Sequence, residues 1–134
     1  MLRIVLDTNI LISAIIHNGI PRKLFQMGID GKYQILTSKG TLEELSGVLQ
    51  RSKFKMTRED IIRIISALMN AGENVWVTSN FKVIINDPDD DIIINTAHDG
   101  KADYIVSGDS DIQNLENFHG IKIVSVNGML KILE

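Results

Sequence analysis

The chain has 134 residues, a length that suits one domain. Apolar residues make up 44% of it and charged residues 23%, as in ordinary globular proteins, and the lack of cysteine excludes disulfides and thiolate metal sites. The net charge of -3 by itself argues against nucleic acid as a partner, because phosphate contacts need Lys and Arg, and no apolar run reaches the roughly 20 residues of a membrane span. We therefore expect one cytoplasmic domain over residues 1–134, with no membrane contact.

Short β-rich runs alternate with helical patterns along the chain, which is typical of an α/β domain. The pattern predicts, in chain order, a strand at Leu2–Leu6, helices at Thr8–His17 and Arg22–Gly28, a strand at Tyr33–Thr37, helices from Ser38 or Thr41 to Arg51 and at Thr57–Ala71, a strand at Val75–Val77, a helix at Asp90–Asp99, a strand at Asp103–Ser107, a helical turn at Ile112–Asn117, a strand at Ile121–Val124 and a helix at Val126–Leu133. Right-handed crossovers between these strands predict a three-layer α/β/α sandwich around a mainly parallel five-stranded sheet. The single Trp76 and the phenylalanines are expected in its core.

Four carboxylates stand where the predicted strands end or the predicted helices begin. Asp7 directly follows the first strand, Asp109 follows the fourth, Asp90 starts the helix before the fourth strand, and Glu44 lies in the helix after the second. Ligands bind beyond the carboxyl ends of parallel strands, so we expect Asp7, Asp90 and Asp109 to cluster there, joined by Glu44 if its helix begins near that edge.

Such a cluster predicts a divalent metal ion. Four carboxylates repel one another unless a cation lies among them, and hard oxygen ligands without cysteine or paired histidines select Mg²⁺ or Mn²⁺. A site of this kind can hydrolyse a phosphodiester without a nucleophilic side chain.

Each of these acids except Asp7 has a purely structural alternative. Asp90 and Asp109 are good helix N-caps, and Thr41-x-x-Glu44 fits a capping box. Asp7 ends a buried strand rather than capping a helix, and a buried carboxylate there is costly unless it is paired or metal-bound. The combination of the four carries the prediction more than any one member.

The charge is unevenly distributed. Residues 87–91 carry four acids, whereas residues 51–58 carry four bases and no acid. This basic run is either a solvated loop or a phosphate-binding flank, and its candidates for RNA contact are Arg51, Lys53, Lys55 and Arg58.

Three segments of the chain resemble the PIN domain family, and within it the VapC-like toxin components of prokaryotic toxin–antitoxin pairs. These are IVLDTNILISA around Asp7, TLEELSGVLQR around Glu44, and INDPDDDIIINTAHDGKADYIVSGDSDI, which contains Asp90 and Asp109. The resemblance makes Asp90 the third acid, with Asp91 as the neighbouring alternative. Ser107 stands where the family usually has threonine.

The resemblance implies Mg²⁺- or Mn²⁺-dependent cleavage of single-stranded RNA, a homodimer, and inhibition by a small antitoxin. We expect Asp7, Asp90 and Asp109 to bind the metal and orient the attacking water, and Glu44 to complete the site. The expected supporting residues are Thr8, Asn9, Asp91, Ser107 and Asp111.

Two alternatives remain at this stage. A small haloacid-dehalogenase-like phosphatase also has an aspartate after its first strand, but it needs a second one where this chain has Asn9. A non-catalytic PIN-like module for RNA or protein binding is the other, although such modules usually lose one or more of the four acids.

Overall fold

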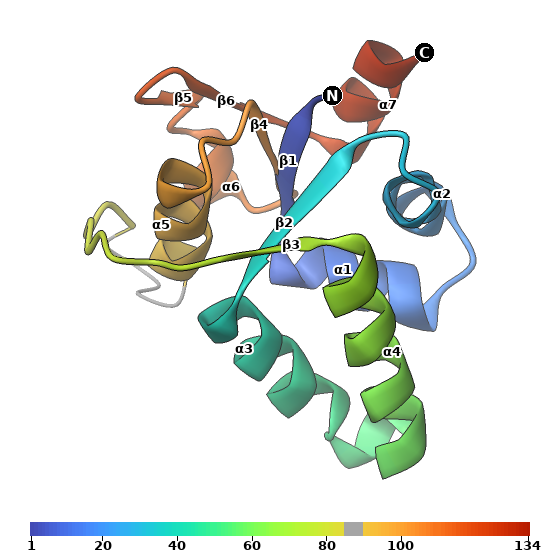
Figure 1. Ribbon diagram of the computed structural model, residues 1–134. Coiled ribbons are helices and arrows are strands. Elements are labelled where there is room, and N and C mark those ends of the chain that lie inside the picture. Colours follow the sequence, from blue (N-terminus) through green and yellow to red (C-terminus); the bar gives the residue numbers. More distant parts are fainter. Residues whose placement is uncertain (85–89) are drawn as a thin grey trace.

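The computed structural model describes residues 1–84 and 90–134, so most of the acidic run 87–91 lies outside the described residues. Figure 1 shows a sheet between two layers of helices, with strand order β3-β2-β1-β4-β6-β5. The elements are β1 (Arg3–Leu6), α1 (Thr8–Ile16), α2 (Ile20–Ile29), β2 (Gln34–Ser38), α3 (Lys39–Leu49), the 3₁₀ helix η1 (Ser52–Phe54), α4 (Arg58–Ala71), β3 (Glu73–Val75), α5 (Asp91–Asp99), β4 (Tyr104–Val106), α6 (Ser110–Gln113), β5 (Asn117–Phe118), β6 (Ile121–Val124) and α7 (Val126–Leu133).

The predicted three-layer α/β/α sandwich with a mainly parallel sheet is confirmed. The described sheet has six strands where five were predicted, because β5 pairs antiparallel with β6 at one edge. The turn between them is His119–Gly120, and both residues have positive φ angles, 50° and 86°. A two-residue hairpin turn of this kind usually contains Asn-Gly or Gly-Gly, so His-Gly between such short strands gives a weak sequence signal.

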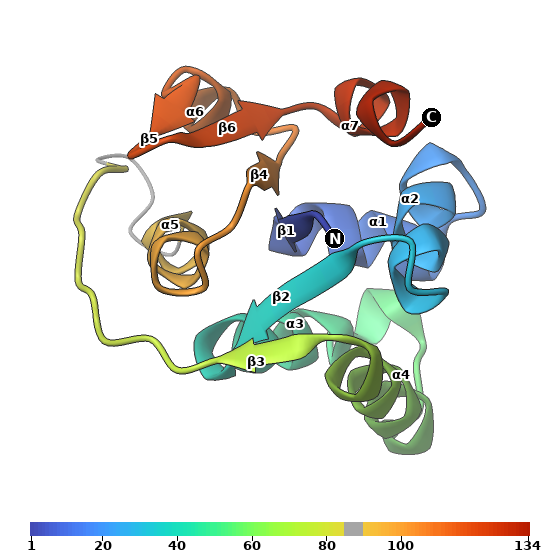
Figure 2. The same cartoon turned by 45° about the horizontal axis from the view of Figure 1, so that its top comes forward.

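Alternation along the strands builds a core on each face of the sheet. Ile4 and Leu6 of β1 lie in one core and Val5 in the other, all at most 1% exposed. The first core is closed by α1, α2, α3, α4 and α7, and the second by α5 and α6 (Figure 2). Consecutive strands buried on both faces explain why their sequences read as continuous apolar runs.

Trp76 was predicted to lie in the core, and this prediction is wrong. Its side chain is 88% exposed just after the edge strand β3, which begins at Glu73 and ends before the tryptophan. Trp76 lines a surface groove of about 720 Å³ between α3 and α4, together with Leu42 and Met69.

Among the described residues, no helix combines the length and apolar character that crossing a membrane requires.

Candidate active site

Asp7 links the end of β1 to the start of α1. It is 3% exposed, and its backbone N–H donates to the carbonyl of Val106 in β4 at 2.9 Å. Its Oδ2 accepts a hydrogen bond from Ser107 Oγ at 2.7 Å, and its Oδ1 accepts the backbone N–H of Asn9 at 3.4 Å. Asp7 is therefore the N-cap of α1, which corrects the expectation that it caps no helix. A strand that runs directly into a helix leaves no loop for a separate cap.

A chain of hydrogen bonds continues from Asp7 to Asp109. Ser107 is fully buried, and its Oγ accepts the backbone N–H of Asp109 at 3.0 Å while donating to Asp7. Asp109 caps α6, because its Oδ1 accepts the N–H groups of Asp111 at 2.8 Å and Ile112 at 3.4 Å. One hydroxyl thus links the Asp7 carboxylate to the backbone of Asp109, and the start of α6 holds the Asp109 carboxylate.

The electrostatics of Asp7 reflect this closeness. Burial raises the pKa of Asp7, the hydrogen bonds from Ser107 and from the N–H groups of Asn9 and Thr8 oppose that rise, and the negative charge of Asp109 adds to it. The net pKa lies above the ordinary value for aspartate. A cation placed between the two carboxylates would relieve both the burial cost and the repulsion.

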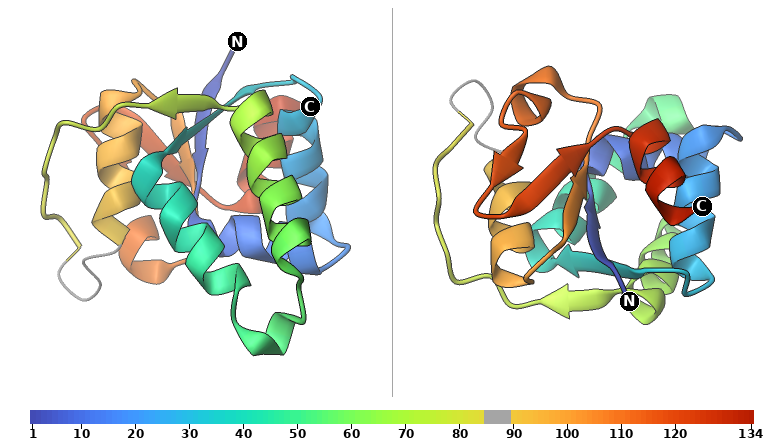
Figure 3. Two further views of the ribbon diagram at one scale, coloured as in Figure 1. Left: turned by 60° about the horizontal axis from the view of Figure 1, so that its bottom comes forward. Right: turned by 90° about the horizontal axis from the view of Figure 1, so that it is seen from above.

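Asp7 and Asp109 follow β1 and β4, the neighbouring strands between which the strand order of the sheet reverses. β1 and β4 are parallel neighbours, yet the helix that follows β1 packs on one face and the helix that follows β4 packs on the other. Figure 3 shows α1 and α6 starting near each other at this edge. Ligands of open α/β sheets bind at such a switch point, beyond the carboxyl ends of the strands.

Glu44 lies in the second turn of α3 and is half-buried. The N-cap of this helix is Ser38, whose Oγ accepts the N–H of Thr41, so Thr41 does not start a capping box with Glu44. The capping-box alternative for Glu44 is therefore wrong. Ser38 Oγ also contacts Thr96 Oγ1 at 2.8 Å, which joins the start of α3 to α5 through a buried hydroxyl pair. Ser38 was predicted as one of two possible starts of this helix, but its contact with Thr96 was not predicted, because Thr96 does not stand out from ordinary helix residues.

Asp90 and Asp91 behave differently at the start of α5. Asp90 occupies the N-cap position with helical angles of -68° and -21°, but its side chain does not cap the helix. Asp91 accepts the backbone N–H groups of Val83 and Ile84 on its Oδ1, each at 2.9 Å.

The remaining predicted supporting residues are also placed by the structure. Asn9 contacts Asp7 through its backbone N–H rather than its side chain, and Asp111 contacts Asp109 in the same way. Thr8 is 2% exposed, and its Oγ1 has no hydrogen-bond partner within residues 1–84 and 90–134. Gln113 was not predicted from the sequence, and its Nε2 donates to the Ser107 carbonyl at 2.7 Å.

The structure thus brings Asp7 and Asp109 together, with Glu44 and Asp90 on flanking helices. Within the part of the chain that the structure describes, no three acidic or histidine side chains are close enough to hold one ion. The donor set nevertheless fits Mg²⁺ or Mn²⁺. Magnesium is commonly bound through one or two carboxylates and keeps several of its waters, so the Asp7–Asp109 pair has donor chemistry suited to such an ion.

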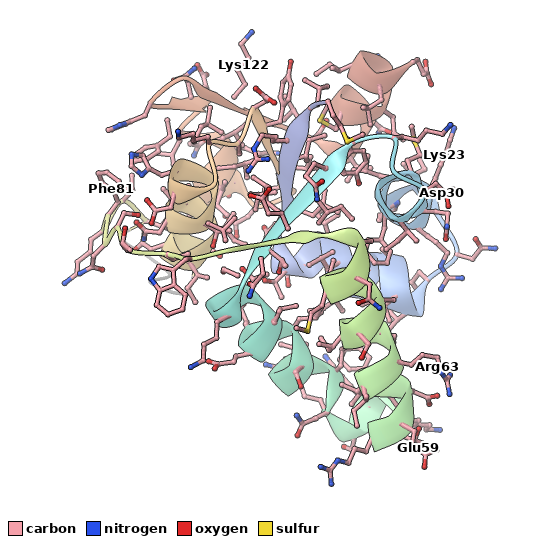
Figure 4. All side chains as sticks on the ribbon, viewed as in Figure 1. Lys23, Asp30, Glu59, Arg63, Phe81 and Lys122 are labelled. Atoms are coloured by element: carbon pink, nitrogen blue, oxygen red, sulfur yellow. The ribbon has the colours of Figure 1, made fainter. Side chains whose placement is uncertain are left out.

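The predicted basic residues lie at the opposite end of α3 from Ser38. Their loop includes η1 and the start of α4, close to Glu59, which Figure 4 labels. An 11-residue helix is about 16 Å long, so this loop at the C-terminal end of α3 lies about that far from Ser38 at the N-terminal end of α3. All four bases are exposed, and Lys53 Nζ lies 5.1 Å from the ring centroid of Phe54. The exposed residues are Arg51, Lys53, Lys55 and Arg58.

Comparisons with known proteins agree with this fold. An uncharacterized protein of Methanocaldococcus jannaschii is 32% identical over 120 residues, which cover 87% of this chain and 76% of that protein. The crystal structure of VapBC2 from Rickettsia felis, bound to a DNA fragment from its promoter, contains a similar chain with a TM-score of 0.64 and 17% identity, covering 92% of this chain and 98% of that one. At that identity the structural likeness shows the fold alone.

A family model described as "PIN domain" matches residues 3–111. The matched span contains Asp7, Glu44, Asp90 and Asp109, and the match removes the phosphatase alternative. The chain belongs to the PIN domain family.

Proposed function

We propose that this protein is a Mg²⁺- or Mn²⁺-dependent endoribonuclease that hydrolyses phosphodiester bonds of single-stranded RNA. The observation that carries the proposal is the hydrogen-bonded chain from Asp7 through Ser107 to Asp109 at the switch point of the sheet. A buried carboxylate with a raised pKa beside a second carboxylate is typical of a functional site. Membership of the PIN domain family supports nuclease activity.

The residues have distinct roles in this proposal. Asp7 and Asp109 would hold the metal ion directly and Asp90 would hold it through one of its waters, and the ion would supply Lewis-acid activation of water and of a phosphate oxygen when bound. An ionised carboxylate has about four acceptor positions, and the described hydrogen bonds occupy at most three on Asp7 and two on Asp109. Both side chains can therefore stay fixed by the protein and still bind an ion. Glu44 completes the site, directly or through a water.

The supporting residues restrict the motion of these carboxylates. Ser107 donates to Asp7 and is itself held by Gln113 through its carbonyl. Because the orienting contacts of Asp7 and Asp109 include the backbone N–H groups of Asn9 and Asp111, the carboxylates keep their positions without substrate. Such preorganisation favours a single in-line geometry at the phosphate.

We further propose that the protein is the toxin of a toxin–antitoxin pair, that it acts in the cytoplasm as a homodimer, and that a small antitoxin inhibits it. The support is the likeness to a chain of the VapBC2 structure together with the resemblance of the three motifs. Co-expression with the product of a short neighbouring gene tests the partner, since a true antitoxin should form a stable complex and suppress cleavage.

Replacing Asp7 with Asn tests the catalytic proposal. The Asp7→Asn variant should lose Mn²⁺-dependent cleavage of a fluorescent single-stranded RNA while keeping its circular dichroism spectrum. The control is Glu59→Gln, an exposed acid at the far end of the molecule, which should cleave like the wild type (Figure 4). Calorimetric titration with Mn²⁺ adds a second readout. A non-catalytic module would show no Mn²⁺ site that depends on Asp7, and unchanged cleavage by Asp7→Asn would overturn the assignment.

A further inference from the structure

Residues 78–84, which we call the strap, run along α5 in extended form. In Figure 3 the strap passes outside α5, on the side away from β1. Three side chains of α5 bind its backbone: Asp91, Asn95 and Asp99. These residues are four positions apart, so they lie on one face of the helix. Ile84 is 5% exposed and packs in the second core, which fixes the end of the strap beside Asp91.

The contacts of Asp99 and Asn95 fix the first part of the strap. Asp99 Oδ2 accepts the N–H groups of Thr78 at 2.6 Å and Ser79 at 2.8 Å. Burial raises the pKa of Asp99, but these bonds and one to His98 outweigh that effect and hold its pKa below the usual range. Asn95 accepts the N–H of Phe81 at 2.7 Å and donates to the Phe81 carbonyl at 3.1 Å, so it needs both ends of its amide.

Asp91 acts only as an acceptor toward the strap. Its Oδ1 receives two backbone N–H groups at 2.9 Å, from Val83 and Ile84. These bonds hold Asp91 on the face of α5 that meets the strap, away from β1, and turning it toward the site would break both and leave two part-buried donors unsatisfied. Asp90 has helical backbone angles, so its side chain leaves the helix about 100° away from that of Asp91. When Asp91 faces the strap, Asp90 therefore faces a different direction.

We propose that Asp91 is a positioning residue, not a metal ligand: it clamps the strap to α5, and the clamp sets the start of α5 so that Asp90 is the third carboxylate of the site. The inference rests on the proposed function for the role of Asp90, whereas the clamp itself is independent of any activity. It also explains why two adjacent aspartates stand at the start of α5, since each has a separate task.

The chemistry of each position predicts different tolerances. An asparagine at position 91 keeps the oxygen that accepts both N–H groups, so Asp91→Asn should keep the clamp. Alanine removes the acceptor. At position 95 the reverse swap is harmful, because Asn95→Asp loses the donor to Phe81 and adds a negative charge between Asp91 and Asp99.

Hydrogen exchange of the Val83 and Ile84 amides, measured beside RNA cleavage, tests the proposal. Asp91→Asn should match the wild type in both within about twofold, because its bonds persist. Asp91→Ala should exchange at least about tenfold faster and cleave more slowly, and Asn95→Asp should loosen the amide of Phe81 in the same way. Asp90→Asn should keep wild-type exchange and lose cleavage.

Two results would overturn the proposal. One is an Asp91→Asn variant as inactive as Asp90→Asn with its strap still protected, because the charge of Asp91 would then be needed at the metal. The other is full protection of Val83 and Ile84 in Asp91→Ala. If the wild-type protein cleaves no RNA, the proposed function fails, and the exchange data alone still decide whether Asp91 clamps the strap.

Discussion

Replacing Ser107 with alanine should damage both the stability and the pH dependence of this protein. The hydroxyl gives a 2.7 Å bond to a buried carboxylate, and a hydrogen bond to a charged group contributes about 1.5–3 kcal/mol. It also accepts the N–H of Asp109, a half-buried group that water can reach in part, so we add only the lower estimate of about 1 kcal/mol. The sum is about 3 kcal/mol, or a decrease in Tm of roughly 10 °C for a chain of this length.

The same substitution should move the acid limb of the cleavage profile. The bond from Ser107 lowers the pKa of Asp7, so its loss leaves that pKa still higher. If cleavage needs ionised Asp7, the rise of kcat/KM with pH should shift to higher pH in Ser107→Ala. Ser107→Thr keeps the hydroxyl and should keep the wild-type limb, even where the extra methyl group costs some stability.

Calorimetry measures the loss of stability, and a pH–rate profile measures the shift of the acid limb. A double-mutant cycle isolates the contribution of the bond between Ser107 and Asp7. In the Asp7→Asn background the partner is neutral, so Ser107→Ala should cost less stability than in the wild type. A loss of stability below about 1 kcal/mol together with an unshifted acid limb would show that Ser107 does not orient Asp7.

The remaining predictions concern Asp7 itself and the basic loop. The pKa of Asp7 is raised in the folded protein, so the folded state binds the proton of Asp7 more tightly than the unfolded state does. The free energy of unfolding of the wild type should therefore fall as the pH rises from the ordinary carboxyl range through the raised pKa. Denaturant unfolding of Asp7→Asn should show a stability advantage that grows over that window, and an advantage that does not change with pH would contradict the electrostatic account. For the loop, changing Lys53 and Lys55 to Gln should flatten the dependence of RNA affinity on salt, by about 0.7 in the log–log slope for each phosphate that these lysines neutralise in the wild type, without changing kcat. An unchanged slope, measured by fluorescence anisotropy, would identify a solvated loop.

The sequence predicted the sheet and its layers because two periodic signals dominate them. Buried strands such as β1 read as continuous apolar runs, and α4 carries an apolar face with a capping box at Thr57 and Asp60. β5 was missed because two residues are too few for any period. The strap was missed for a different reason: it is held by side chain to backbone bonds from a helix that follows it in the chain, and such bonds leave no pattern in the strap itself.

The candidate site was predictable to the extent that topology determines it. Asp7 and Asp109 each follow a strand, and parallel neighbouring strands bring their carboxyl ends together. The contacts that fix them were less visible. Gln113 stands in an ordinary short helix, and its bond to the Ser107 carbonyl depends on how α6 turns back toward β4. Trp76 shows the limit of composition, since a single tryptophan in an apolar chain still lies on the surface.

Helix capping and metal binding are chemically compatible roles for one carboxylate. Asp7 and Asp109 both cap helices, and the cap fixes the side chain with oxygen acceptor positions to spare. Asp91 differs in where its donors lie, because Val83 and Ile84 belong to the strap, which passes α5 on the side away from β1. An acid at the start of a helix should therefore be judged by where its hydrogen bonds direct it, since capping at a sheet switch point places a carboxylate where a cation can reach it.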